Sequence, residues 1–160
     1  EIGYEYSSSI FPVHHDLYGM PDAPRFAFRH HDGQGILEIP ATTVRLGGRN
    51  LPCSGGGYFR LLPYTFSRWA LRRVNCREQQ ACVFYFHPWE VDPEQPRQTG
   101  APWRSRFRHY TNLDRMEFRL NRLLTDFSFG RMDEVFLEPR GQTSASTGLS
   151  GTLSELRHIG

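Results

Sequence analysis

A histidine that closes an apolar segment is the residue of this sequence best placed to do chemistry. Ala81–Phe86 is continuously apolar and rich in aromatic side chains, and His87 follows it directly. Such a run is typical of a strand buried on both faces of a parallel sheet, and α/β folds gather their active-site groups where such strands end. Trp89 and Glu90 add an aromatic wall and a carboxylate. His87 is therefore predicted either to act as a general acid or to close the strand with no chemical role.

The other histidines give weaker signals for a metal site. His14-His15 and His30-His31 are adjacent pairs, and adjacent side chains diverge on either a strand or a helix. Metal ligands that share one element are instead spaced so that both side chains face the ion. We expect loop histidines here that bond to nearby carbonyls, and no metal ligand set in this chain.

The three cysteines also lack the spacing of a zinc site, because no Cys-x-x-Cys pair is present. Free structural thiols are the main prediction. A single disulfide between Cys76 and Cys82 is the alternative in an oxidising compartment.

A glycine triplet, Gly55-Gly56-Gly57, precedes Tyr58. It lacks the Lys-Ser/Thr of a P-loop and the spacing of a dinucleotide fingerprint. The triplet is interpreted as a flexible hinge before a helix, with two further possibilities left open. One is a backbone approach to a ligand, and the other is a plain tight turn.

Arginine and aromatic residues alternate in Trp103–Tyr110, as they do on nucleic-acid or glycan surfaces. All 19 basic residues are arginine, yet the net charge is only +2, and no nucleic-acid motif accompanies the segment. No nucleic-acid partner is predicted. A glycan-facing strip, with three arginines on one side of an extended segment, and amphipathic packing beside the next helix both remain open.

The hydrophobic pattern predicts alternating elements. A helix is expected from near Tyr58 or Pro63 to Asn75, and a second one over Asn112–Phe127, where apolar residues recur every three or four positions. Asn112 is the expected N-cap of the second helix. The three arginines of that helix are expected to lie largely off its apolar face. Short strands are predicted at residues 36–39, 43–46, 81–86 and 135–137, with a turn at 47–50. This order predicts an α/β layered or barrel fold.

The 160 residues suit one domain. Residues 1–139 are predicted to be globular, and Arg140–Gly160 forms a polar, low-complexity tail. No apolar stretch approaches the ~20 residues of a membrane span, and no signal peptide is visible, so the compartment is left open between cytoplasm and periplasm. The chain starts at Glu1 rather than at a methionine and enters a strand-like stretch at once, so we expect it to be part of a longer protein.

Several segments occur together in an order typical of one enzyme family. They are Tyr4–Pro12, His15–Gly19, Pro21–Arg25, Leu37–Pro40, Gly55–Arg60 and Phe84–Glu90. Over about residues 1–139 the chain resembles the C-terminal half of bacterial polysaccharide deacetylases of the NodB-homology type, carbohydrate esterase family 4. The branch it resembles is encoded beside exosortase and exopolysaccharide genes and carries a C-terminal domain of unknown function.

The resemblance implies a fold, a chemistry and a site. The fold would be part of a distorted (β/α) barrel with a C-terminal helical extension. Family members use a divalent metal, usually zinc, to activate water against the N-acetyl group of an N-acetylated polysaccharide. His87 matches the histidine that protonates the leaving amine. Trp89, Glu90, Tyr58 and Phe86 are the expected substrate-binding residues.

The sequence also departs from this family. The motif with paired acidic residues, the His-x-x-x-His metal motif and an arginine-containing motif are all absent. We therefore expect that the metal is held by a missing N-terminal half and that this chain alone is inactive. The competing hypothesis is a non-catalytic carbohydrate-binding or assembly module that uses Trp89, Trp103, Tyr110 and nearby arginines.

Overall fold

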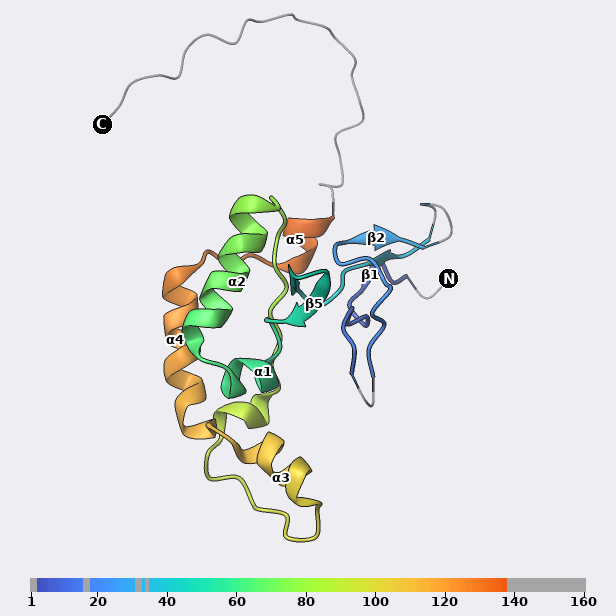
Figure 1. Cartoon of the computed structure of the whole chain (residues 1–160). Coiled ribbons are helices and arrows are strands. Elements are labelled where there is room, and N and C mark those ends of the chain that lie inside the picture. Colours follow the sequence, from blue (N-terminus) through green and yellow to red (C-terminus); the bar gives the residue numbers. More distant parts are fainter. Residues whose placement is uncertain (1–2, 16–17, 31–32, 34, 138–160) are drawn as a thin grey trace, which may run out of the picture.

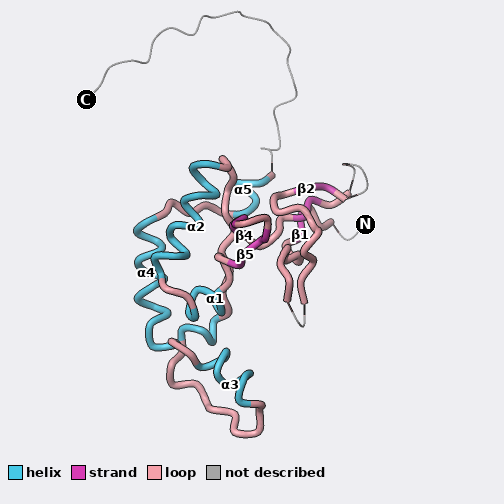
Figure 2. The backbone as a smooth tube through the Cα atoms, in the orientation of Figure 1, coloured by secondary structure: helices cyan, strands magenta, loops and turns pink. Residues whose placement is uncertain are grey.

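The computed structural model describes residues 3–15, 18–30, 33 and 35–137 (Figure 1). The helices α2 and α4 lie on one side of the molecule and the strands on the other, where α5 is also found (Figure 2). The elements in chain order are β1 (Tyr6–Ser7), β2 (Phe28–Arg29), β3 (Leu37–Glu38), β4 (Thr43–Leu46), β5 (Arg49–Pro52), α1 (Gly56–Leu61), α2 (Tyr64–Arg77), η1 (Pro88–Val91), α3 (Trp103–Tyr110), η2 (Leu113–Arg115), α4 (Met116–Asp126) and α5 (Met132–Phe136).

The described strands form two small sheets. In the first, β3 lies between β1, which runs parallel to it, and β2, which runs antiparallel. In the second, β4 and β5 form an antiparallel hairpin with Thr43 opposite Pro52. Gly47 and Gly48 connect the hairpin with φ values of 56° and 80°, as a two-residue turn with both central residues left-handed requires. The predicted turn is confirmed at these two glycines.

The main core lies where α2 and α4 pack beside the β4–β5 hairpin (Figure 1). α2 confirms the helix predicted up to about Asn75 and runs two residues further, to Arg77. Its inward face includes the buried Ala70, Leu71 and Val74, whereas Trp69 is 42% exposed. The buried residues of this cluster are Val44, Cys53, Phe59, Tyr64, Ala70, Leu71, Met116 and Leu123.

The predicted helix over residues 112–127 forms with an altered start. Asn112, with φ 53°, occupies the N-cap position of a 3-10 turn and not of α4. Its side chain makes no capping hydrogen bond, because its nitrogen donates to the Arg60 carbonyl at 2.7 Å. A turn of 3-10 helix then precedes α4. Arg119, expected largely off the apolar face, is half-buried, and its Nη1 donates to the carbonyls of Phe59, Arg60 and Leu62 at 2.6, 2.9 and 3.0 Å. The guanidinium thereby satisfies carbonyls at the end of α1 that lack intrahelical partners.

The strand predicted over Ala81–Phe86 is wrong in its burial and pairing. Among the described residues, the segment has one bridge, between Tyr85 and Gly55, and only Val83 within it is buried. A buried central strand needs a paired neighbour on both edges and a cover on both faces. Here the Val83 amide donates to the Thr42 hydroxyl at 2.7 Å, so a side chain, and not the backbone of a neighbouring strand, accepts this hydrogen bond.

Two further predictions are corrected. Val135–Leu137 is not a strand, because residues 132–136 form α5, which packs Met132 and Phe136 against Leu37, Ile39 and Val83. Trp103–Tyr110 is the helix α3 and not an extended strip. The described residues form a mixed α/β fold with small sheets and contain no closed barrel. The predicted tail, Arg140–Gly160, lies outside them.

A buried carboxylate fixes the loop after β1 to β3. Glu38 is 1% exposed, and its Oε1 accepts hydrogen bonds from the amides of Ser9 and Ile10 at 2.7 and 2.8 Å. Burial opposes ionisation of Glu38, but these amides and neighbouring serine hydroxyls outweigh it, so the pKa of this carboxyl lies below its ordinary value of 4.5. Two of the segments that carry the family resemblance, 4–12 and 37–40, are thus joined through one side chain.

Replacing Glu38 with Gln should lower the free energy of unfolding by about 1–3 kcal/mol, since hydrogen bonds to a charged acceptor are lost. Because the folded pKa is depressed, the contribution of Glu38 is present above its ordinary pKa of 4.5 and is lost as pH falls through the folded pKa. Urea unfolding at about pH 7 and about pH 3 should show the gap between wild type and Glu38→Gln shrinking in acid. The exposed Glu94→Gln is the matched control. A gap that does not change with pH would contradict this account.

Candidate functional site

A buried ion pair lies directly beneath the predicted site. Arg60 of α1 and Glu90 of η1 are each 1% exposed. Nε of Arg60 donates to Oε1 of Glu90 at 3.0 Å, and Nη2 lies at the same distance from that oxygen. The remaining donors reach backbone carbonyls: Nη1 donates to His109 and Thr111 at 3.1 and 2.7 Å, and Nη2 to Arg108 at 3.2 Å. A buried charge is stable only when paired and hydrogen-bonded in this way.

Glu90 also holds the predicted catalytic residue in place. Its second oxygen, Oε2, accepts a hydrogen bond from the backbone amide of His87 at 2.8 Å. Both carboxylate oxygens are therefore engaged within the protein and withdrawn from the surface. The placement of Glu90 favours a structural role over the predicted substrate contact.

Gly56 makes room for this carboxylate. A Cβ at Gly56 would lie 2.0 Å from Oε2 and 2.6 Å from Cδ of Glu90, well inside van der Waals contact. The Gly56 amide donates to the Tyr85 carbonyl at 2.9 Å. The flexible hinge expected at the glycine triplet is thus wrong: Gly56 begins α1, and the close backbone approach that requires glycine is toward Glu90.

Above the ion pair, Trp89 stacks with two imidazoles. The ring centroids of His87 and Trp89 are 5.8 Å apart with an interplanar angle of 9°, and those of Trp89 and His109 are 4.0 Å apart at 13°. The Arg60 guanidinium lies 5.3 Å from the Trp89 ring centroid. Oε1 of Gln95 accepts a hydrogen bond from Nε2 of His109 at 2.8 Å, and Nε2 of Gln95 donates to the Trp89 carbonyl at 2.7 Å. We call His87, Trp89 and His109 the ring stack.

His87 is the exposed member of the stack, while Trp89 and His109 are half-buried. The Tyr85 ring meets His87 edge-on at 6.2 Å, and Tyr85 and Phe86 are 38% and 42% exposed. An exposed imidazole beside exposed rings can hydrogen-bond to a polar ligand whose apolar face lies on the aromatic surface.

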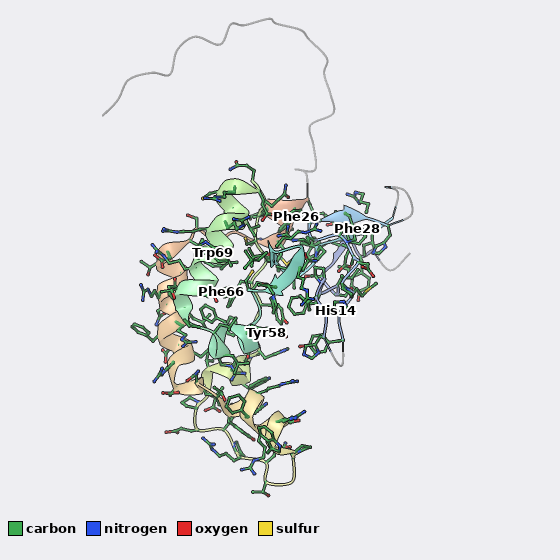
Figure 3. All side chains as sticks on the ribbon, viewed as in Figure 1. His14, Phe26, Phe28, Tyr58, Phe66 and Trp69 are labelled. Carbon is green, nitrogen blue, oxygen red and sulfur yellow. The ribbon has the colours of Figure 1, made fainter. Side chains whose placement is uncertain are left out.

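Tyr58 belongs to a neighbouring aromatic cluster. It lies on the side of α1 that faces the loop carrying His14 (Figure 3), where it packs edge-on against Phe11 at 6.2 Å. Phe11 in turn stacks on Tyr18 at 6.4 Å. Burial, reinforced by Tyr18, Glu90 and Tyr58, raises the pKa of the Tyr85 hydroxyl, so Tyr85 stays neutral and acts as a hydrogen-bonding group.

A known protein family covers most of the described part of the chain. A family model described as "Domain of unknown function (DUF3473)" matches residues 8–137. The chain belongs to the DUF3473 family. No curated protein and no solved structure matches the chain significantly.

The described part of this DUF3473 domain offers no metal centre. No three His, Cys, Asp or Glu side chains within it lie close enough together to hold an ion. His15 stacks on Tyr18 at 4.0 Å, and His30 packs edge-on against Phe28 at 5.0 Å; His31 lies outside the described residues.

The cysteines of the domain are free thiols. Cys53 is buried, Cys76 is exposed, and no disulfide joins Cys76 to Cys82. Burial raises the pKa of both the Cys53 and the Cys82 thiol to about 12. Cys82 donates to the Asn75 side-chain oxygen at 2.9 Å. None of the described helices combines the length and the hydrophobicity that crossing a bilayer requires.

Sequence reasoning placed His87, Trp89, Tyr58 and Phe86 near one surface but missed three partners. Arg60 appeared only as the end of the segment Gly55–Arg60, and no role was predicted for His109 or Gln95. A buried arginine has no distinctive spacing in sequence. Only the Glu90 carboxylate, 30 positions later, makes its burial possible.

The glycine triplet provides a sharp test of the buried pair. Gly56→Ala should displace the Glu90 carboxylate, leave Arg60 without its counter-ion, and lower the free energy of unfolding by about 3–5 kcal/mol. Gly57→Ala, one position along the same helix, meets no atom within 4 Å and should raise it by about 0.4–1 kcal/mol. Chemical denaturation of both variants measures the two effects. Equal stability of the two variants would show that the close contact between Gly56 and the Glu90 carboxylate does not require glycine at position 56.

Proposed function

We propose that this domain forms the glycan-facing part of a metal-dependent polysaccharide N-deacetylase, an enzyme that hydrolyses acetamido groups on an exopolysaccharide. The observation that carries the proposal is the exposed His87 imidazole. It stacks on Trp89, and the backbone amide of His87 donates to the buried Glu90 carboxylate. The resemblance of the segments 55–60 and 84–90 to this enzyme family supports it. In the structure these two segments are in contact through Arg60 and Glu90.

The reaction needs a group in the position of His87. Water adds to the amide carbonyl, the C–N bond breaks, and the leaving nitrogen must gain a proton to depart as an amine, giving acetate and a free amino sugar. An imidazolium can donate that proton. Backbone anchoring of His87 restricts where its ring can reach, and such positioning is a large part of catalytic efficiency.

The metal that the resemblance implies finds no ligand set among the described residues. We therefore assign the metal ligands to another segment. The roles left to this domain are substrate binding and proton donation. The segment 81–86 supports such an assembly. Among the described residues it has one bridge, to Gly55, and its Tyr85 and Phe86 side chains are exposed. These are features of an unpaired sheet edge, which could pair with further strands of a distorted barrel.

A second candidate function is a non-catalytic carbohydrate-binding module. The ring stack and the 71% exposed Trp103 favour it, because aromatic faces pack well on sugar rings. Under this proposal, His87 and Tyr85 would supply hydrogen bonds to sugar hydroxyls and would carry no proton in a reaction.

The two candidate functions predict different effects of replacing His87. In a protein that joins this domain to a metal-binding NodB-type segment, His87→Ala should lower kcat for acetate release from a chitooligosaccharide about 10²–10⁴-fold with little change in KM. The exposed His14→Ala is the control. The chain alone, supplied with zinc, should release no acetate.

Two outcomes would go against the deacetylase proposal. Zinc-dependent acetate release by the purified chain would contradict the assignment of the metal to another segment. Unchanged kcat in His87→Ala, together with weaker oligosaccharide binding measured by tryptophan fluorescence, would favour the binding module.

A further inference from the structure

A second concave surface lies on the outer side of α2 and α4 and shares no residue with the ring stack. It is a depression of about 390 Å³. Its lining comes from α2 and from one residue of α4, and Trp69, which borders it, is labelled on α2 in Figure 3. The lining residues are Thr65, Arg68, Trp69, Arg72, Arg73, Cys76, Arg77 and Arg122.

Five of these eight residues are arginines, and none is acidic. Four of them stand on α2 as two i, i+4 pairs, Arg68 with Arg72 and Arg73 with Arg77, and the members of each pair are neighbours on the helix surface. Arg122 reaches the same depression from α4. A folded domain with a net charge of only +2 has thus concentrated a large share of its positive charge at one place.

The protein itself neutralises little of this charge. Asp126 is the acidic group nearest to it: it accepts a hydrogen bond from the Tyr64 hydroxyl at 2.6 Å and lies 3.0 Å from Nε of Arg68 and 4.0 Å from that of Arg122. The Tyr64 hydrogen bond, together with the nearby arginines, holds the pKa of the Asp126 carboxyl below its ordinary value, although burial opposes this. Asp126 therefore stays charged and offsets one of the five cations.

The other three arginines, Arg72, Arg73 and Arg77, make no hydrogen bond or ion pair with an acidic side chain of the described residues, although Arg72 lies near enough to Asp126 to stabilise its charge. Arg73 lies 6.0 Å from the Trp69 ring centroid, and its buried Nε has no hydrogen-bond partner in the described part of the chain. Cations that repel one another without a counter-ion cost stability, so this arrangement suits the binding of an anion.

We propose that this depression binds a phosphate group, and that a diphosphate or a phosphate ester is its ligand. Guanidinium forks match the oxygens of phosphate and can donate two parallel hydrogen bonds each. One carboxylate brings a single negative charge, whereas a phosphate monoester brings about two, which better balances the four positive charges left beside Asp126. The exposed Trp69 offers a flat surface for the organic part of an ester.

The test uses the full chain and inorganic pyrophosphate, titrated by calorimetry at low salt. The variant is Arg72→Gln/Arg77→Gln, since both side chains are exposed and hold no other element in place. It should weaken pyrophosphate binding about tenfold or more, because charge-assisted contacts are lost. The control is Arg45→Gln/Arg49→Gln on the β4–β5 hairpin, which removes the same charge from another exposed surface and should leave binding unchanged. Equal melting temperatures of the variants confirm that folding is intact.

Cys76 gives a second, local readout because it lines the depression and is exposed. Burial raises the pKa of the other two thiols to about 12, so an alkylating reagent should modify Cys76 first. Pyrophosphate should slow that modification in wild type and in the hairpin control, but not in Arg72→Gln/Arg77→Gln.

Vesicles that contain phosphatidic acid distinguish the two sources of a phosphate group. Vesicle binding that pyrophosphate competes away assigns the site to a lipid headgroup, and pyrophosphate binding without vesicle binding assigns it to a soluble phosphate compound. Absence of pyrophosphate binding, or equal loss in both double variants, would overturn the proposal. Preferential binding of polygalacturonate would overturn it as well and assign the surface to a carboxylated polymer. None of these variants changes a residue of the ring stack. Failure of the phosphate-site proposal would therefore leave the deacetylase proposal unaffected, and the reverse also holds.

Discussion

The buried Arg60–Glu90 pair is the interaction on which the rest of the structure depends. Two charges removed from water must be compensated by good geometry and further hydrogen bonds, or the fold is destabilised by several kcal/mol. Here the compensation draws three parts of the chain together: α1, the turn that carries η1, and the carbonyls at the end of α3. Gly56 is required because a side chain there would occupy the position of the carboxylate.

This buried network explains why an exposed site can be precise. His87 is anchored by its amide to Glu90, and Trp89 lies over the Arg60 guanidinium. Neither ring therefore depends on loop rigidity alone. The segments 55–60 and 84–90, which carry much of the resemblance to polysaccharide deacetylases, are the two sides of this network, as 4–12 and 37–40 are the two sides of the Glu38 network. In both cases a buried carboxylate joins residues far apart in sequence.

The two candidate surfaces follow different chemistry. The ring stack is aromatic, with an imidazole at its exposed end, and suits a neutral sugar. The α2–α4 depression is cationic and suits a phosphate group. α2 serves both the core and the depression: Ala70, Leu71 and Val74 face inward, while its arginines face outward. A domain with these two surfaces could hold a polymer by its sugars and a separate anion at the same time.

The sequence alone determined the elements whose signals are local. The periodicity of α2 and α4 and the two glycines of the β4–β5 turn act within a few residues, so both helices and the hairpin turn were predictable. For the site, the position of His87 beside Trp89 was predictable for the same reason. Only the tertiary structure decided that residues 81–86 have one bridge to the rest of the described chain, that Val135–Leu137 falls at the end of a helix, and that Arg60 is buried against Glu90. A short apolar run becomes strand or helix according to partners distant in sequence, and a charge can be buried only where the fold supplies its counter-ion.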